Sequence, residues 1–284
     1  MKKIKDNVVL FLKGFIMGVA NVIPGVSGGT LAVILGVFKD FLGAISNIFK
    51  TFWKSVLFLF PIVLGMGVAI LASSKLIETC LNKFPLATVL FFVGLILGGI
   101  PILFKKIKNE MKSIPNYIIF GIVFMFVLVF TFFISGEKNV ELINLNFFDY
   151  ILLFLVGALA SASMVIPGIS GSMVLMTVGY YNGILATVNN LFDFSMFWEN
   201  VAILIPFGLG VVVGILLISK LITYLLNKYE VKTYFAIFGF IFSSLIVMFF
   251  KNSITFNIVE FTIGLVLLMI GFIGSYLIAK TNKE

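Results

Sequence analysis

The chain has 284 residues, of which 61% are hydrophobic and only 11% are charged. Soluble domains carry roughly 25% charged residues, so this composition excludes an ordinary water-soluble fold and indicates a membrane protein. The net charge of +8 comes from 20 lysines against 12 acidic residues, and lysines in short loops between apolar segments explain it without a nucleic-acid partner.

Six apolar runs have the length of roughly 20 residues that a helix needs to cross a bilayer. In chain order they are 56–73, 86–104, 117–134, 201–219, 235–250 and 258–279. Two other apolar regions, 8–23 and 150–166, behave differently because each runs into a Pro-Gly pair with a short apolar stretch beyond it. About nine apolar residues follow each break, and nine helical residues rise about 13 Å, which is half a membrane.

We therefore predict two re-entrant hairpins, with breaks near residues 24–29 and 167–172. Each would consist of an incoming helix, a Pro/Gly break at membrane depth and a short half-helix that returns to the same side. Non-helical backbone at that depth is tolerated only where it is buried in protein or lines a polar cavity, so the breaks are candidate sites. The alternative is two full spans joined by a kink in each case, which gives ten full spans.

The two breaks belong to an internal repeat. Ile23-Pro-Gly-Val-Ser-Gly-Gly recurs 143 positions later as Ile166-Pro-Gly-Ile-Ser-Gly-Ser, and 74–83 aligns with 219–228 after a two-residue insertion. Polar residues, prolines and glycines stay in step over this distance, which chance apolar similarity does not produce. The sequence thus divides into one repeat over residues 1–140 and a second over residues 141–284.

Each repeat holds an odd number of full crossings, either three or five, so the second repeat must enter the membrane from the opposite side. The predicted fold is an all-α polytopic membrane protein made of two inverted-topology repeats, each a re-entrant helical hairpin plus three transmembrane helices. With a cytoplasmic N-terminus, 16 of the 20 lysines fall on the cytoplasmic side. We predict a multi-pass protein of the bacterial cytoplasmic membrane with both termini cytoplasmic.

The Pro-Gly-x-Ser-Gly turns suit an anion. Their glycines let backbone N–H groups approach a ligand, serine adds a hydroxyl, and a new helix begins with its positive dipole end exposed. Inverted symmetry would bring both turns to one midplane site. The predicted substrate-binding residues are Ser27, Gly28, Gly29, Thr30, Ser170, Gly171 and Ser172 at the turns, with Asn21, Ser161 and Ser163 on the incoming helices.

Three charged residues near span ends have two interpretations each. Lys75 and Lys220 are repeat equivalents that either snorkel to the headgroups or receive an anionic head at each face. Glu260 lies one turn inside a predicted span and is either a coupling carboxylate or an interfacial one.

The glycine pairs Gly94/Gly98 and Gly210/Gly214 predict close helix packing.

Several chemistries are excluded by composition. The single cysteine, Cys80, has no partner for an internal disulfide, and with no histidine in the chain it cannot anchor a zinc or haem site. A phosphate-binding Walker loop and a zincin motif are both missing. We therefore expect no metal, no cofactor and no enzymatic activity, since hydrolysis of a lipid phosphate usually needs histidine, an arginine clamp or clustered acids.

The duplicated motif, and above all the segment Gly18–Thr30, resembles the bacterial polyprenyl-phosphate (undecaprenyl phosphate) transporter family. The second copy is looser, with Met164 where the first has Asn21 and Ser172 where it has Gly29. The resemblance implies a flippase that returns undecaprenyl phosphate, the lipid carrier of cell-wall synthesis, from the outer to the inner leaflet. Its partners would be that lipid and the membrane, while a coupling ion (H⁺ or Na⁺) and a homo-oligomer stay open. A small-anion channel or antiporter that uses the same half-helix N-termini is the alternative.

Overall fold

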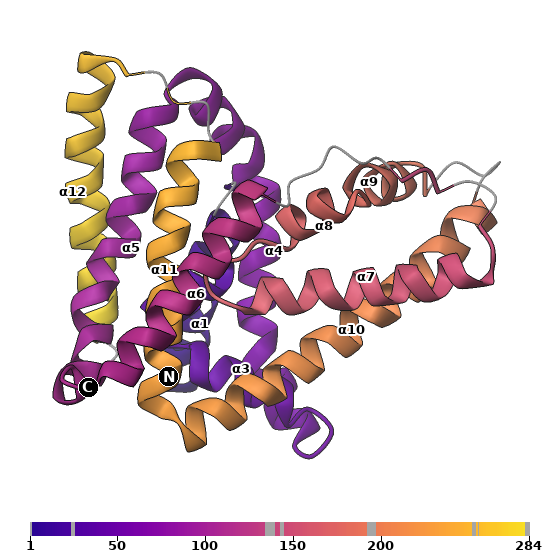
Figure 1. Ribbon diagram of the computed structural model, residues 1–284, viewed down its shortest axis with the longest axis horizontal. Helices are drawn as coiled ribbons and strands as arrows, with labels where there is room; N and C mark the ends of the chain where they lie inside the picture. The colour runs from indigo at the N-terminus through magenta and orange to yellow at the C-terminus, as the bar shows by residue number, and fades with distance from the viewer. Residues whose placement is uncertain are drawn as a thin grey trace.

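The computed structural model describes residues 2–23, 26–133, 140–142, 145–191, 197–251, 254 and 256–281. Within these residues the chain forms twelve α-helices, one short 3₁₀ helix and no β-strand, so the all-α prediction is confirmed (Figure 1). The helices are α1 (Lys2–Asn21), α2 (Gly28–Ile34), α3 (Phe38–Ser46), α4 (Phe52–Lys83), α5 (Pro85–Ile107), η1 (Lys108–Glu110), α6 (Ile114–Phe133), α7 (Phe147–Val165), α8 (Gly171–Val178), α9 (Tyr181–Asn189), α10 (Phe197–Lys228), α11 (Glu230–Lys251) and α12 (Ile258–Thr281).

Seven of the described helices are long and apolar enough to cross a membrane, namely α4, α5, α6, α7, α10, α11 and α12. The six predicted runs fall on α4, α5, α6, α10, α11 and α12, apart from residue 134, which lies outside the described residues. Large apolar side chains such as Phe60 and Leu71 on α4 are exposed, as expected of a surface that faces lipid. The chain is therefore a multi-pass membrane protein.

The segments after the two breaks differ from the prediction of one half-helix each. Two short helices follow each break, α2 and α3 in the first half and α8 and α9 in the second. Gly36 (φ 65°) and Gly179 (φ 83°) lie between the members of each pair, in the left-handed conformation that glycine adopts without a steric penalty. The pair α2–α3 bends by 119° and counts either as one broken span or as a re-entrant loop, so the hairpin assignment stays a prediction.

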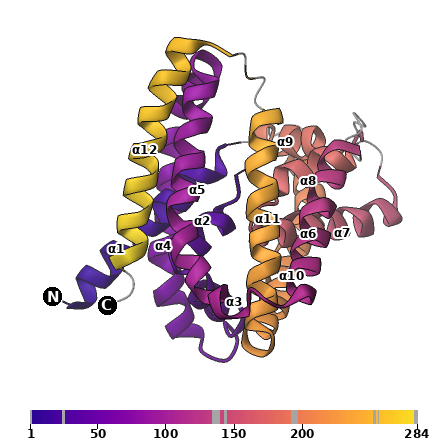
Figure 2. The ribbon, with the colours of Figure 1, turned by 60° about the vertical axis from the view of Figure 1, so that its left-hand side comes forward.

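The helices of the two halves correspond in order and closely in length. For example, α4 and α10 both have 32 residues, and α3 and α9 both have nine. Within each half the incoming helix packs along the long helix, as α1 with α4 and α7 with α10, whereas α5 packs with α12 and α6 with α11 across the halves (Figures 1 and 2). This correspondence supports the predicted duplication, while the inverted orientation stays a prediction.

Glycines bring the paired helices into close contact. An added Cβ at Gly94 or Gly98 would meet the backbone of α12, and one at Gly210 or Gly214 would meet the backbone of α7. The packing role predicted for these glycine pairs is thus confirmed. Helix α2 lies at the centre of the main core, where residues 31–35 are almost completely buried.

Candidate functional site

The two copies of the repeated motif lie against each other, although they are more than 130 residues apart in the sequence. The hydroxyl of Ser27 donates to the backbone carbonyls of Met164 (3.3 Å) and Ile166 (3.4 Å). The N–H of Gly168 donates to Oγ1 of Thr30 at 2.8 Å. Pro24 and Gly25 of the first copy lie outside the described residues. The meeting of the described residues of the two turns accords with the prediction that they share one place.

Local hydrogen bonds fix the first turn at the start of α2. Ser27 is the N-cap of this helix, with an extended backbone, and its Oγ accepts from the N–H of Gly29 at 3.1 Å. The N–H of Gly28 donates to Oδ1 of Asn21 at 2.7 Å. The N–H groups of Gly28 and Gly29, which the sequence assigned to an anion, therefore have protein acceptors in this structure. Ser27 and Thr30 are almost fully buried, with 2% and 0% exposure.

Replacing Thr30 by valine is expected to lower the free energy of unfolding by about 1–3 kcal/mol, because it leaves the buried N–H of Gly168 without an acceptor. Chemical or thermal unfolding of the detergent-purified protein measures the change. Thr262→Val is the matched control, because Thr262 is exposed on α12 and its hydroxyl bonds only within its own helix. Equal unfolding curves for the two variants would mean that the bond between the turns does not contribute to stability.

The second turn has a different hydrogen-bond pattern. Ser170 is the N-cap residue of α8 but makes no side-chain cap bond, and its Oγ lies 2.8 Å from Oγ of Ser172 instead. Ser172 is exposed and Ser170 is half-buried, whereas Gly171 is buried against Met164 and Ala160 of α7. Of the predicted turn residues, the two hydroxyls of Ser170 and Ser172 are thus the ones most open to a ligand.

A cavity of about 230 Å³ adjoins the first turn. Asn21, Gly28 and Gly29 form its polar edge, and the remaining lining residues from α1, α3, α4, α7 and α10 are apolar. Two of these, Val63 on α4 and Met164 on α7, are 57% and 50% exposed, so the cavity reaches the lipid-facing surface between these helices. An apolar cavity with one polar edge is suited to a molecule with an apolar chain and a polar head.

The remaining predicted site residues lie outside this junction. The hydroxyls of Ser161 and Ser163 donate to carbonyls of their own helix, at Ala158 (3.1 Å) and Ala160 (2.6 Å). Lys75 and Lys220 are exposed on α4 and α10. Oε1 of Glu260 accepts from the N–H of Ala87 (3.1 Å) and so satisfies a free N–H group in the first turn of α5. This bond gives Glu260 a structural role, and its coupling role stays a prediction.

Two polar pockets at the ends of the long helices were not predicted. One lies between α3, α4 and α10, and the other lies among α7, α9, α10 and residues 140–142. The sequence does contain a signal for them, because Phe52-Trp53-Lys54-Ser55 and Phe197-Trp198-Glu199-Asn200 occupy equivalent positions of the repeat. In both pairs the aromatic rings pack edge to face, with centroids 5.4 Å and 5.3 Å apart.

Comparisons with known proteins identify the family of this chain. Residues 17–276 match a family model described as undecaprenyl phosphate translocase-like. The chain is 36% identical over 279 residues to a polyprenyl-phosphate transporter of Staphylococcus aureus, covering 96% of each chain. It is 30% identical over 234 residues to a polyprenyl-phosphate transporter of Vibrio cholerae, covering 78% of this chain and 70% of that one. No solved structure matches. The family match spans both copies of the motif and almost the whole chain, and the chain is therefore a member of the undecaprenyl phosphate translocase-like family.

Proposed function

We propose that this protein is a transporter that returns undecaprenyl phosphate from the outer to the inner leaflet of the bacterial cytoplasmic membrane. The observation that carries the proposal is the junction of the two motif copies beside a cavity with one polar edge. Family membership and the names of the two relatives support the lipid as substrate. Transport of this kind moves the lipid without covalent chemistry.

The predicted site is uncharged, which suits an anionic head that must bind and then be released during transport. Asn21, Gly28 and Gly29 at the cavity and Ser170 and Ser172 at the second turn offer amide and hydroxyl groups, and none of these residues is ionisable. Neutral donors in a dry site attract a phosphate but hold it less tightly than a lysine would. In the proposed cycle, a phosphate oxygen replaces Oδ1 of Asn21 as the acceptor for the N–H of Gly28.

The cavity favours a lipid over a small ion. Its wall is mostly apolar, and it opens toward the exposed faces of Val63 and Met164, where a prenyl chain has a lateral path from the bilayer. A chloride or a free phosphate would need an aqueous path. The proposed direction of transport is the one that the resemblance to the family implies. The lysine distribution predicts cytoplasmic termini, and the coupling ion and oligomeric state stay open.

The double variant Ser170→Ala/Ser172→Ala is expected to translocate undecaprenyl phosphate at least tenfold more slowly in proteoliposomes. Hydrogen bonds to a charged group contribute about 1.5–3 kcal/mol, and about 1.4 kcal/mol corresponds to a factor of ten. The hydroxyls bond mainly to each other in this structure, so the melting temperature should stay within a few degrees of the unmodified protein. Protection of labelled lipid from an added outer-leaflet reagent measures translocation.

Thr79→Ala is the control, because it removes an exposed hydroxyl of α4 that bonds only to the carbonyl of Lys75. Equal translocation by the double variant and the control would refute the contact with Ser170 and Ser172. The same vesicles also test the alternative function, since flux of chloride or inorganic phosphate without lipid translocation would identify a small-anion channel or antiporter.

A further inference from the structure

The two polar pockets lie at equivalent positions of the repeat. The pocket between α3, α4 and α10 has a volume of about 530 Å³, and the pocket beside α9 and α10 has about 910 Å³. In the register of the repeat, Lys39 corresponds to Asn182, Asn47 to Asn190 and Lys54 to Glu199, and all six residues line the two pockets. We call them the basic pocket and the acidic pocket.

Both pockets lie beside a tryptophan at the start of a long helix. Trp53 in α4 and Trp198 in α10 are the chain's two tryptophans, and their side chains are 74% and 79% exposed. Exposed tryptophan in a membrane protein is enriched at the headgroup level of the bilayer. Lys54 and Glu199 directly follow these tryptophans, so both pockets lie at the depth of lipid headgroups.

The two pockets differ in charge. Lys39 and Lys54 line the basic pocket with one carboxylate, Asp40, and an adjoining hollow of about 370 Å³ adds Lys50 and Lys220. The acidic pocket is lined by Glu141 and Glu199, with no lysine among its described lining residues. An anion is therefore attracted to one end of the molecule and repelled from the other.

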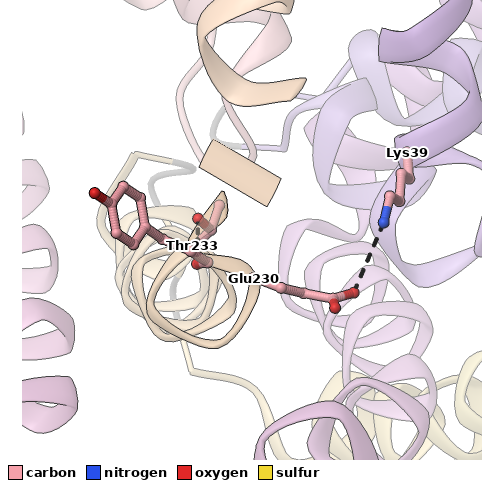
Figure 3. Close-up of polar contacts among 4 residues, drawn as sticks. Lys39, Glu230 and Thr233 are labelled. Atoms are coloured by element: carbon pink, nitrogen blue, oxygen red, sulfur yellow. Dashed lines mark hydrogen bonds and ion pairs between the residues drawn. The ribbon is translucent and has the colours of Figure 1, made fainter. Parts of the chain in front are cut away.

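The cations of the basic pocket are available to a ligand. Nζ of Lys39 lies 4.0 Å from Oε1 of Glu230, and both side chains are about half exposed, so this ion pair is weak (Figure 3). Among the residues that the structure describes, Lys54 has no carboxylate within ion-pair distance. The Oγ1 of Thr223, which borders both the pocket and the adjoining hollow, is buried and has no hydrogen-bond partner among the described residues.

Helix α3 separates the basic pocket from the apolar cavity beside the first turn. Residues Gly43 and Asn47, at the end of α3, face the basic pocket, whereas Phe41 and Ile45 line the cavity beside the first turn. On α4, Phe58 lines the basic pocket and the next residue, Leu59, lines the apolar cavity. A molecule with a phosphate head and an apolar chain matches this arrangement of a basic pocket beside an apolar cavity.

We propose that the basic pocket binds the phosphate monoester head of a polyprenyl lipid at one face of the membrane. Lys39 and Lys54 supply the charge, and the amides of Asn47 and Asn227 and the hydroxyl of Thr223 supply further hydrogen-bond donors. The acidic pocket has no such site, so the two ends of the transport path hold the head with different affinities. This inference rests on the proposed function for the identity of the lipid.

The test is binding of farnesyl phosphate, a short polyprenyl phosphate, to the full-length protein in nanodiscs of zwitterionic lipid. Lys39→Gln/Lys54→Gln is expected to weaken binding at least tenfold, and added salt should weaken binding to the unmodified protein. Lys83→Gln/Lys106→Gln is the control, because it removes two exposed lysines that line neither the basic pocket nor the adjoining hollow. This variant is expected to bind farnesyl phosphate as the unmodified protein does. Unaltered melting temperatures show that the variants are folded.

Two further ligands separate the lipid head from other sources of the same chemistry. Inorganic phosphate that binds as tightly as farnesyl phosphate would overturn the lipid assignment, as would farnesol that binds as tightly. Unchanged affinity in Lys39→Gln/Lys54→Gln would overturn the site while leaving the proposed function intact. Failure of the proposed function is a different result, in which the unmodified protein neither binds farnesyl phosphate nor translocates undecaprenyl phosphate.

Discussion

Replacing Gly168 by alanine is expected to cause the largest loss of stability of any single substitution at the repeated motif. Gly168 has φ +85°, a conformation that costs a residue with a side chain about 1–3 kcal/mol. An added Cβ would also meet the backbone carbonyl oxygen of Phe240 on α11, and relieving this overlap costs about another 1–3 kcal/mol. Moving the backbone of residue 168 away from Phe240 would also distort the hydrogen bond from its N–H to Thr30, which joins the two turns.

The expected outcome is a melting temperature lowered by several degrees or more and a reduced yield of monodisperse protein after detergent extraction. Gly208→Ala on α10 is the control, because a Cβ added there has no neighbour within 4 Å and alanine is favourable in a helix. If Gly168→Ala melted at the same temperature as Gly208→Ala, the junction would have no energetic importance for the fold.

The spans and the pairing of the two turns could be predicted because both depend on patterns in the chain itself. Long apolar runs such as 201–219 can be satisfied only as helices in a bilayer, and α10 contains that run. The repeat of Pro-Gly-x-Ser-Gly marked both breaks, and the hydrogen bonds from Ser27 to the second copy connect them.

The hydrogen-bond partners within the site could not be predicted in the same way. The sequence indicated that N–H groups at the turn are free for an anion, but Asn21 and Ser27 accept from two of them. Such local caps depend on the path of the backbone between residues 21 and 28, which no periodicity describes. The two short helices after each break were missed for a similar reason, because Gly36 and Gly179 end the first helix of each pair within an apolar run.

The structure also shows an asymmetry between the halves that a repeat alone does not predict. Helix α3 packs against α10 of the other half, beside the basic pocket. Its equivalent α9 packs against α8 and α10, and in the described part of the chain it has no comparable contact with α4. The end of the molecule at α3 is thus more closely packed than the end at α9, which agrees with the larger acidic pocket. In transporters built from inverted repeats, two such arrangements interchange during transport.

Bridging α3 to α10 is therefore expected to abolish transport. Ser46 and Tyr224 line the same hollow between these helices, and both side chains are at least partly exposed. In a Cys80→Ser background, the pair Ser46→Cys/Tyr224→Cys treated with a short bifunctional maleimide would hold the packed end closed. Translocation of undecaprenyl phosphate in proteoliposomes should fall to the level of empty vesicles, because the substrate can then exchange at one face only.

Two controls distinguish the effect of the bridge on transport from the effect of the reagent's bulk. The same cysteine pair treated with a monofunctional maleimide carries similar bulk without a bridge and should retain most of its activity. A bifunctional maleimide with an internal disulfide should block transport until a reductant cleaves it, after which activity returns. Full translocation by the bridged protein would mean that α3 and α10 stay together throughout transport, and the difference between the two ends would then be a fixed feature of the fold.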